Sequence, residues 1–177
     1  MEFIKAHHQQ NIITTLKHFP GHGSAVADSH LGFVDVSTTW SEQEIIPYED
    51  LINHSKVDMI MTAHIFNANL DEKLPATLSY NTITNSLRKK LNYNGVVVSD
   101  DMQMKAISDH YGLEKAITLA FNAGVDILLF GNNLKYDPDI VTKTVNIVKQ
   151  QISDEITPLH QIEKSWQRVM NLKQKYL

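Results

Sequence analysis

Four short apolar segments constrain the fold of this chain most strongly, because a helix-like pattern follows each of them. They are rich in β-branched and other apolar residues and lie at residues 12–18, 57–63, 95–99 and 125–130. Strands with apolar residues at nearly every position are buried on both faces, which is typical of parallel sheets covered by helices. The sequence therefore predicts an α/β fold of four strand–helix units.

The segments between these strands carry helix signals. Ser41 and Glu44 have the spacing of a capping box, although Pro47 is expected to kink or restart the helix that follows. Ser79 is a suitable N-cap for a second helix, and Gly124 is a suitable stop for a third that begins near residue 112. The remaining helices are expected at about 138–151 and 157–177, and residues 2–10 resemble the tail of another.

The length of the chain limits how these units can be arranged. A complete (β/α)8 TIM barrel typically needs about 250 residues, whereas this chain has 177. We therefore expect one partial domain, residues 1–177, that forms the C-terminal half (four βα units) of a barrel whose N-terminal half is missing. A flavodoxin-like sheet is the alternative, but no glycine-rich phosphate loop follows the first strand.

Polar residues follow each predicted strand at the point where the strand ends. They are Lys17 and His18, His64, Asp100, and Asn132 with Asn133. Because the carboxyl ends of parallel strands emerge on one face, these side chains are expected to share a site.

Composition narrows the classes of partner and chemistry. The net charge is −4 and no run of lysine and arginine suggests a nucleic acid or a membrane surface as partner. Cysteine is absent from the sequence, which excludes disulfides and thiolate chemistry. The chain shows no signal peptide and no apolar run of membrane-spanning length, so a cytoplasmic location is expected.

Several motifs together resemble one known family. The segment Lys-His-Phe-Pro-Gly-His-Gly at residues 17–23, followed by Asp28-Ser29-His30, resembles the signature of family 3 glycoside hydrolases, in their β-N-acetylhexosaminidase branch. Residues 97–102 (Val-Val-Ser-Asp-Asp-Met) look like the nucleophile segment of that family, and residues 75–79 and 123–126 also follow its pattern. The resemblance covers nearly the whole chain, but only the C-terminal half of the family's barrel domain.

The resemblance implies a retaining hydrolase that releases terminal β-linked N-acetylglucosamine through a covalent glycosyl-aspartate. By residue match, Asp100 would be the nucleophile, His30 the general acid/base and Asp28 the carboxylate that orients His30. A two-step displacement needs one ionised carboxylate and one proton carrier, and a histidine titrates close to neutrality. The reaction needs no cofactor and no metal.

The other polar residues receive supporting roles. The family motif suggests that Lys17 and His18 bind sugar hydroxyls. His64 either lines the pocket or is a hydrogen-bonded core residue, and both possibilities are open. His22 is expected to shape the loop and Asp101 to be structural.

Two further functional classes are open from the sequence. The first is a metal-dependent hydrolase, because the set His18, His22, Asp28, His30, His64 and Asp100 contains metal-ligand types, although no tight spacing supports it. The second is an inactive sugar-binding fragment, since a half barrel lacks the substrate contacts of the absent half. Its two open sheet edges predict pairing as a homodimer, pairing with a separately encoded N-terminal half, or an origin as a shortened part of a longer protein.

Overall fold

The structure is a computed structural model that describes residues 1–25, 32–54, 57–133 and 135–176. The first half contains α1 (Glu2–His8), β1 (Thr15–Phe19), β2 (Val34–Asp35), η1 (Glu42–Glu44), α2 (Ile46–His54), β3 (Met59–Thr62) and β4 (Ile65–Phe66). The second half contains η2 (Ala76–Leu78), η3 (Asn81–Lys90), β5 (Val96–Asp101), α3 (Lys105–Tyr111), α4 (Leu113–Ala123), β6 (Ile127–Leu129), α5 (Ile140–Ser153) and α6 (Leu159–Tyr176).

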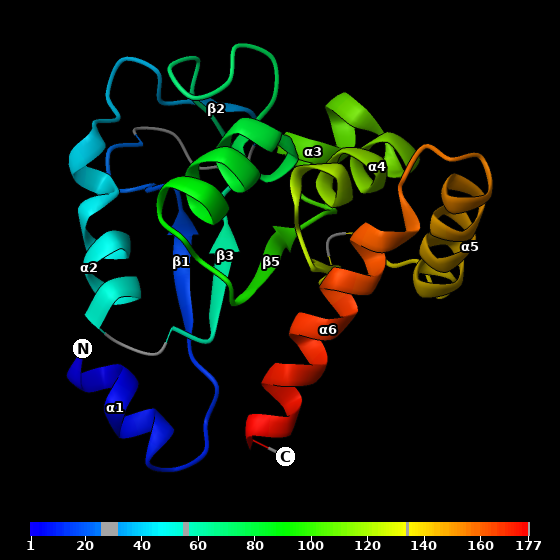
Figure 1. Cartoon of the computed structure of the whole chain (residues 1–177). Helices are drawn as coiled ribbons and strands as arrows, with labels where there is room; N and C mark the ends of the chain where they lie inside the picture. The colour runs from blue at the N-terminus through cyan, green and yellow to red at the C-terminus, as the bar shows by residue number, and fades with distance from the viewer. Residues whose placement is uncertain (26–31, 55–56, 134, 177) are drawn as a thin grey trace.

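The main sheet has four parallel strands in the order β1-β3-β5-β6, which is their order along the chain (Figure 1). This confirms the predicted α/β fold with a parallel sheet. A flavodoxin-like sheet reverses its strand order at a switch point. Among the described strands the order does not reverse, so the arrangement is compatible with consecutive units of a barrel.

The largest apolar core lies between the sheet and its helices. Ile60 of β3 and Val97 of β5 are fully buried there against Leu87 of η3 and Ala120 of α4. Within β3 and β5 the residues next to Ile60 and Val97 point to the opposite face of the sheet. The core therefore fixes which side chains face away from the helices.

The other face of β1 and β3 is incompletely covered. Leu16 and Ile60 pack into the core, whereas their neighbours Thr15 and Lys17 are exposed and Met59 and Met61 are only half-buried. An eight-stranded barrel fills this side of the sheet with inward-pointing side chains. The described chain thus presents one open sheet face beside its edge strand β1.

Of the three helix signals at Ser41, Pro47 and Ser79, only the first differs from the prediction. Ser41 directly precedes η1 but makes no capping hydrogen bond, so the capping-box prediction is wrong; the Glu44 carboxylate instead accepts a hydrogen bond from the Gly23 amide. Pro47 is the second residue of α2, and the helix restarts there as expected. The predicted cap at Ser79 is confirmed, because its hydroxyl oxygen accepts a hydrogen bond from the Thr82 amide at 3.0 Å.

Glycines set two other helix boundaries. Gly112 has a φ of 69° and separates α3 from α4; α4 begins directly after it, as predicted, whereas α3 was not predicted as a separate helix. Gly124 adopts the left-handed conformation that ends α4, as predicted.

A second, two-stranded sheet, in which Val34 pairs with Ile65, was not predicted because each strand has only two residues.

A single carboxylate ties the two ends of the chain to the sheet. The side chain of Asp58, which directly precedes β3, is completely buried. One oxygen accepts hydrogen bonds from Lys175 and Tyr176 of α6 at 2.6 and 2.7 Å. The other lies 2.6 Å from His8 Nε2 and 3.1 Å from the Thr14 amide.

The hydrogen bonds to the Asp58 carboxylate lead us to expect a loss of folding stability in acid. Burial alone would raise the pKa of Asp58, but the hydrogen bonds, above all that from Lys175, lower it from 3.8 to about 2. Folding thus favours the ionised form, and its contribution of about 2 kcal/mol is present above pH 4 and is lost between pH 4 and 2. Urea unfolding across this range should show a shallower pH dependence for Asp58→Asn than for the wild type. Equal pH slopes for the two proteins would contradict the assignment.

Candidate active site

The ends of β1 and β5 bring two predicted site residues together. His18 Nε2 lies 3.6 Å from Asp100 Oδ2, and the two side chains are 29% and 20% exposed. The strand β3 lies between β1 and β5 in the sheet, so this contact spans the rim formed by three strand ends. The structure therefore groups Asp100 and His18, which lie 82 positions apart, as the strand-end rule predicts.

Backbone contacts hold the Asp100 carboxylate. Its Oδ1 accepts a hydrogen bond from the Asp101 amide at 2.8 Å, while Oδ2 faces His18. A partly exposed carboxylate in this position can reach a ligand that enters from the rim. It has the chemical requirements of a nucleophile for a two-step displacement.

The neighbouring carboxylate of Asp101 has a different role. Its Oδ1 accepts a hydrogen bond from the Gln103 amide at 3.0 Å and thereby closes the turn that follows β5. A side chain added at Gly131 would come within 2.7 Å of Asp101 Oδ2, so this carboxylate packs closely against the chain after β6. These contacts agree with the structural role expected for Asp101.

His64 follows β3 and is buried, with only 1% of its surface exposed. Its Nδ1 lies 2.8 Å from the Thr77 hydroxyl and its Nε2 lies 3.0 Å from the Asp101 carbonyl oxygen. Burial lowers the pKa of His64, although the charge of Asp100 acts in the opposite direction. Because protein groups engage both ring nitrogens, the predicted contact of His64 with a sugar gives way to a role inside the protein.

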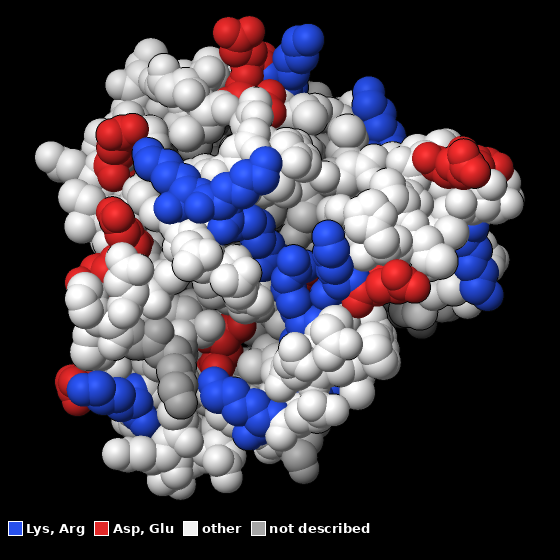
Figure 2. Space-filling view, viewed as in Figure 1, with Lys and Arg blue, Asp and Glu red and all other residues white. Residues whose placement is uncertain are grey.

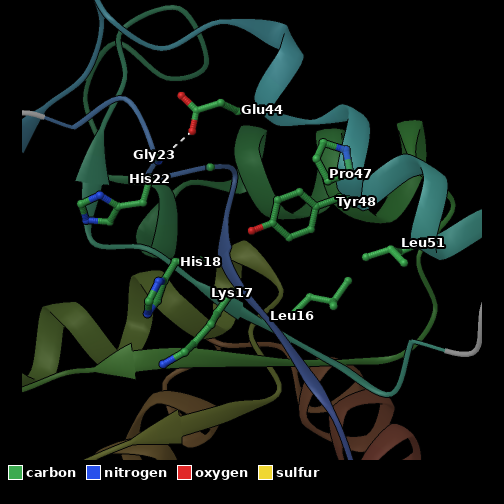
Figure 3. Close-up of a pocket in the computed structure, with 10 residues that line it drawn as sticks. Leu16, Lys17, His18, His22, Gly23, Glu44, Pro47, Tyr48 and Leu51 are labelled. Atoms are coloured by element: carbon green, nitrogen blue, oxygen red, sulfur yellow. Dashed lines mark hydrogen bonds between the residues drawn. The ribbon is translucent and has the colours of Figure 1, made fainter. Parts of the chain in front are cut away.

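A cavity of about 390 Å³ lies between β1 and α2. Figure 3 shows Lys17 and His18 from β1, and Tyr48 from α2, among its lining side chains. Glu44 closes one side, where its carboxylate accepts the Gly23 amide hydrogen bond at 3.0 Å. The cavity adjoins the candidate nucleophile through His18, which both lines the cavity and faces Asp100.

The turn that follows β1 depends on one glycine. Gly21 has a φ of +116°, and an added Cβ would lie 2.5 Å from Glu44 Cβ. We expect Gly21→Ala to destabilise the fold by about 1–3 kcal/mol, because it combines backbone strain with a clash. Gly23→Ala is the matched control, since its nearest neighbour would be Glu44 Oε2 at 3.7 Å. Chemical denaturation measures both, and equal losses would contradict this explanation.

Two of the predicted catalytic residues cannot be placed. Asp28 and His30 lie outside the described residues, so their distance from Asp100 stays a prediction. Within the ranges that the structure does describe, no group of three or more histidine, aspartate or glutamate side chains could hold a metal ion.

The charge distribution on the surface and the lengths of the helices relate to the predictions about nucleic-acid and membrane partners. Acidic and basic side chains are interspersed on the face shown in Figure 2, with basic side chains gathered over η3, whose last turn contains Arg88, Lys89 and Lys90. No described helix is both long and apolar enough to cross a membrane.

Comparison with known families decides the relationship of the chain. Residues 1–172 match the model of the glycosyl hydrolase family 3 N terminal domain. The chain belongs to glycosyl hydrolase family 3. The resemblance inferred from the motifs is thereby confirmed, as is the fold class that it implied.

This family 3 chain is similar in sequence to curated proteins and in structure to a solved enzyme. It is 36% identical to beta-hexosaminidase A of Pseudoalteromonas piscicida over 190 residues, covering 97% of this chain and 31% of that protein. It is 40% identical to a beta-hexosaminidase of Tolumonas auensis over 134 residues, covering 74% and 40% of the two chains. The structure of a family 3 beta-N-acetylglucosaminidase from Paenibacillus sp. matches with a TM-score of 0.89 at 32% identity, covering 99% of this chain and 33% of that one.

The family 3 chain is therefore much shorter than its named relatives. Its matched region spans 31–45% of the length of eight curated beta-hexosaminidases.

Proposed function

We propose that this chain carries the nucleophile half of a retaining β-N-acetylhexosaminidase. Asp100 attacks the anomeric carbon of a terminal β-linked N-acetylglucosamine, forms a covalent glycosyl-aspartate, and releases the sugar when water attacks that intermediate. His30 donates a proton to the leaving oxygen and then takes one from the water. Asp28 orients His30, while Lys17 and His18 bind sugar hydroxyls.

The meeting of His18 and Asp100 at the rim supports this proposal most directly. The candidate nucleophile lies 3.6 Å from a histidine of the segment that carries the family signature. A cavity large enough for a small ligand begins at the same histidine. Names of relatives, such as beta-hexosaminidase, support the choice of sugar.

Hydrolysis of a chromogenic N-acetyl-β-glucosaminide by the whole chain tests the reaction. Release of the chromophore is the expected result. An alternative glucoside that is cleaved equally well would contradict the proposed preference for the N-acetyl sugar. Complete inactivity would favour the second candidate, a sugar-binding fragment, which equilibrium binding of N-acetylglucosamine would detect.

The role of His30 predicts a dependence on the leaving group. We expect His30→Ala to lower kcat/KM, which reports formation of the glycosyl-enzyme, by about 10²–10⁴-fold for a substrate with a poor leaving group, whereas kcat/KM for an activated aryl substrate should fall much less, because its leaving group departs without a proton. Steady-state rates on both substrates measure this difference. His160→Ala, an exposed histidine of α6, is the control and should leave both rates unchanged. Equal slowing of the two substrates would contradict the acid role.

We propose further that a second half barrel covers the open face of β1 and β3. The half-buried Met59 and Met61 leave apolar surface on this face, which a covering layer would remove from water. The short length relative to the curated proteins favours an N-terminal half barrel as this layer. Light scattering tests the alternative, because a homodimer of the 20.1-kDa chain would show twice that mass. The cytoplasmic location stays a prediction.

A further inference from the structure

A buried network of hydrogen-bonded polar side chains lies beneath the rim that carries Asp100. Thr62 and Thr77 are fully buried and His64 is almost so. The two threonine hydroxyls are 2.8 Å apart, and the Thr77 hydroxyl is also 2.8 Å from His64 Nδ1. On its other side the ring reaches the Asp101 carbonyl at 3.0 Å. These hydrogen-bonded side chains therefore link β3 and η2 to the backbone beside the candidate nucleophile.

The chemistry of these partners sets the direction of the hydrogen bonds. A carbonyl oxygen only accepts, so His64 Nε2 must carry the hydrogen that is donated to Asp101. Burial disfavours the imidazolium form of His64. The neutral ring then has an unprotonated Nδ1, which accepts from the Thr77 hydroxyl in competition with the Ala63 carbonyl at 2.9 Å. The network thus selects one tautomer of His64.

The backbone that receives this hydrogen bond is not fixed by a regular strand ladder. Val98 pairs with Ile127 and Asp101 pairs with Leu129, so three steps along β5 correspond to two along β6. Such an irregularity leaves backbone groups without their usual partners and re-aims side chains. At this place the Asp101 carbonyl accepts from His64 and from the Met104 amide, both at 3.0 Å.

The orientation of Asp101 determines where the nucleophile lies. The amide of the same residue donates to Asp100 Oδ1 at 2.8 Å. We propose that His64 is a positioning residue for Asp100, which holds the carboxylate in attacking geometry through the backbone of Asp101. The proposal rests on the hydrolase function proposed above. His64 itself touches no substrate.

This role predicts a split between turnover and substrate binding. A displaced reacting group can cost about 10²-fold in rate. We expect His64→Leu to lower kcat by about 10²-fold with KM nearly unchanged, because the ring does not reach the surface. His64→Gln, which restores an N–H donor toward Asp101, should recover part of the loss. Thr77→Val should lower kcat as well, since the ring loses the hydroxyl that holds its Nδ1.

Thr157→Val is the matched control for these variants. Thr157 is equally buried, but its hydroxyl bonds to Gln151 between α5 and α6. It should lose stability without a selective loss of kcat. Equal effects of Thr157→Val and Thr77→Val on kcat, or a kcat in His64→Leu equal to that of the wild type, would overturn the proposal.

A nitrogen-15 spectrum of the histidines in the whole chain tests the network without any assay of activity. His64 should appear as the neutral Nε2–H tautomer at neutral pH and should change in Thr77→Val. An Nδ1–H tautomer or an imidazolium would overturn the positioning role. If Asp100→Asn retains full activity, the proposed function fails, while the spectrum still decides whether His64 holds the Asp101 carbonyl.

Discussion

Replacement of Asp100 by asparagine should lower hydrolysis of an aryl N-acetyl-β-glucosaminide by about 10⁴-fold or more. The amide is a poor nucleophile, whereas its shape and its contact with the Asp101 amide are retained. The loss should therefore appear in kcat with the fold intact, which circular dichroism and thermal unfolding can verify. No other single substitution is expected to affect catalysis as strongly.

The matched control for Asp100→Asn is Asp109→Asn. Asp109 is an exposed carboxylate of α3 whose side chain accepts from the Ser108 hydroxyl. This variant should keep wild-type rates. A slow substrate with a fluorinated sugar should in addition form a stable covalent adduct. Mass spectrometry should find the added mass of that sugar on the peptide that contains Asp100. Labelling of another peptide, or wild-type activity in Asp100→Asn, would exclude Asp100 as the nucleophile.

Replacement of Asp126 by alanine should destabilise the fold by about 3–5 kcal/mol, the largest stability effect that we expect from one side chain. Its completely buried carboxylate pairs with Arg88 at 2.6 Å and with Arg168 at 2.9 Å. It also accepts hydrogen bonds from the Val97 amide and the Ser165 hydroxyl at 2.8 Å each. The truncation would leave the mostly buried Arg88 guanidinium without its countercharge.

An exposed ion pair provides the comparison for Asp126→Ala. Lys143 and Asp137 lie 2.6 Å apart, with half of the lysine side chain exposed. Lys143→Gln should cost far less stability than Asp126→Ala, because water already screens this pair. Urea unfolding of both variants measures the two values. A loss at Asp126 no larger than that at Lys143 would show that the buried carboxylate does not stabilise the fold.

Local sequence patterns were sufficient for the main sheet and most helices. Continuous apolar runs, such as Val96–Val98, predict strands because no other element buries both faces over so few residues. Gly124 predicts a helix end because its conformation is costly for other residues. The meeting of His18 and Asp100 followed from strand order alone. These features depend on neighbours in the chain or on the general geometry of parallel sheets.

Other features depend on partners that are distant in sequence. Glu44 has a capping-box position, yet its carboxylate binds Gly23, 21 residues earlier. His64 follows a strand like the other rim residues, but its burial depends on Thr77 and Asp101. Asp58 lies within the predicted strand 57–63, and nothing near it in the sequence indicates that its carboxylate binds α6. No periodicity or motif contains these contacts, so the sequence could not predict them.

The contact between Asp58 and the end of α6 has a consequence for synthesis of the chain. The hydrogen bond from Lys175 joins residues 117 positions apart. The ribosome produces residue 58 long before residue 175, so the buried carboxylate must wait for its cation while the intervening units emerge. Until then this end of the sheet is open to water, and it can be sealed only after α6 has been synthesised and packs against β3.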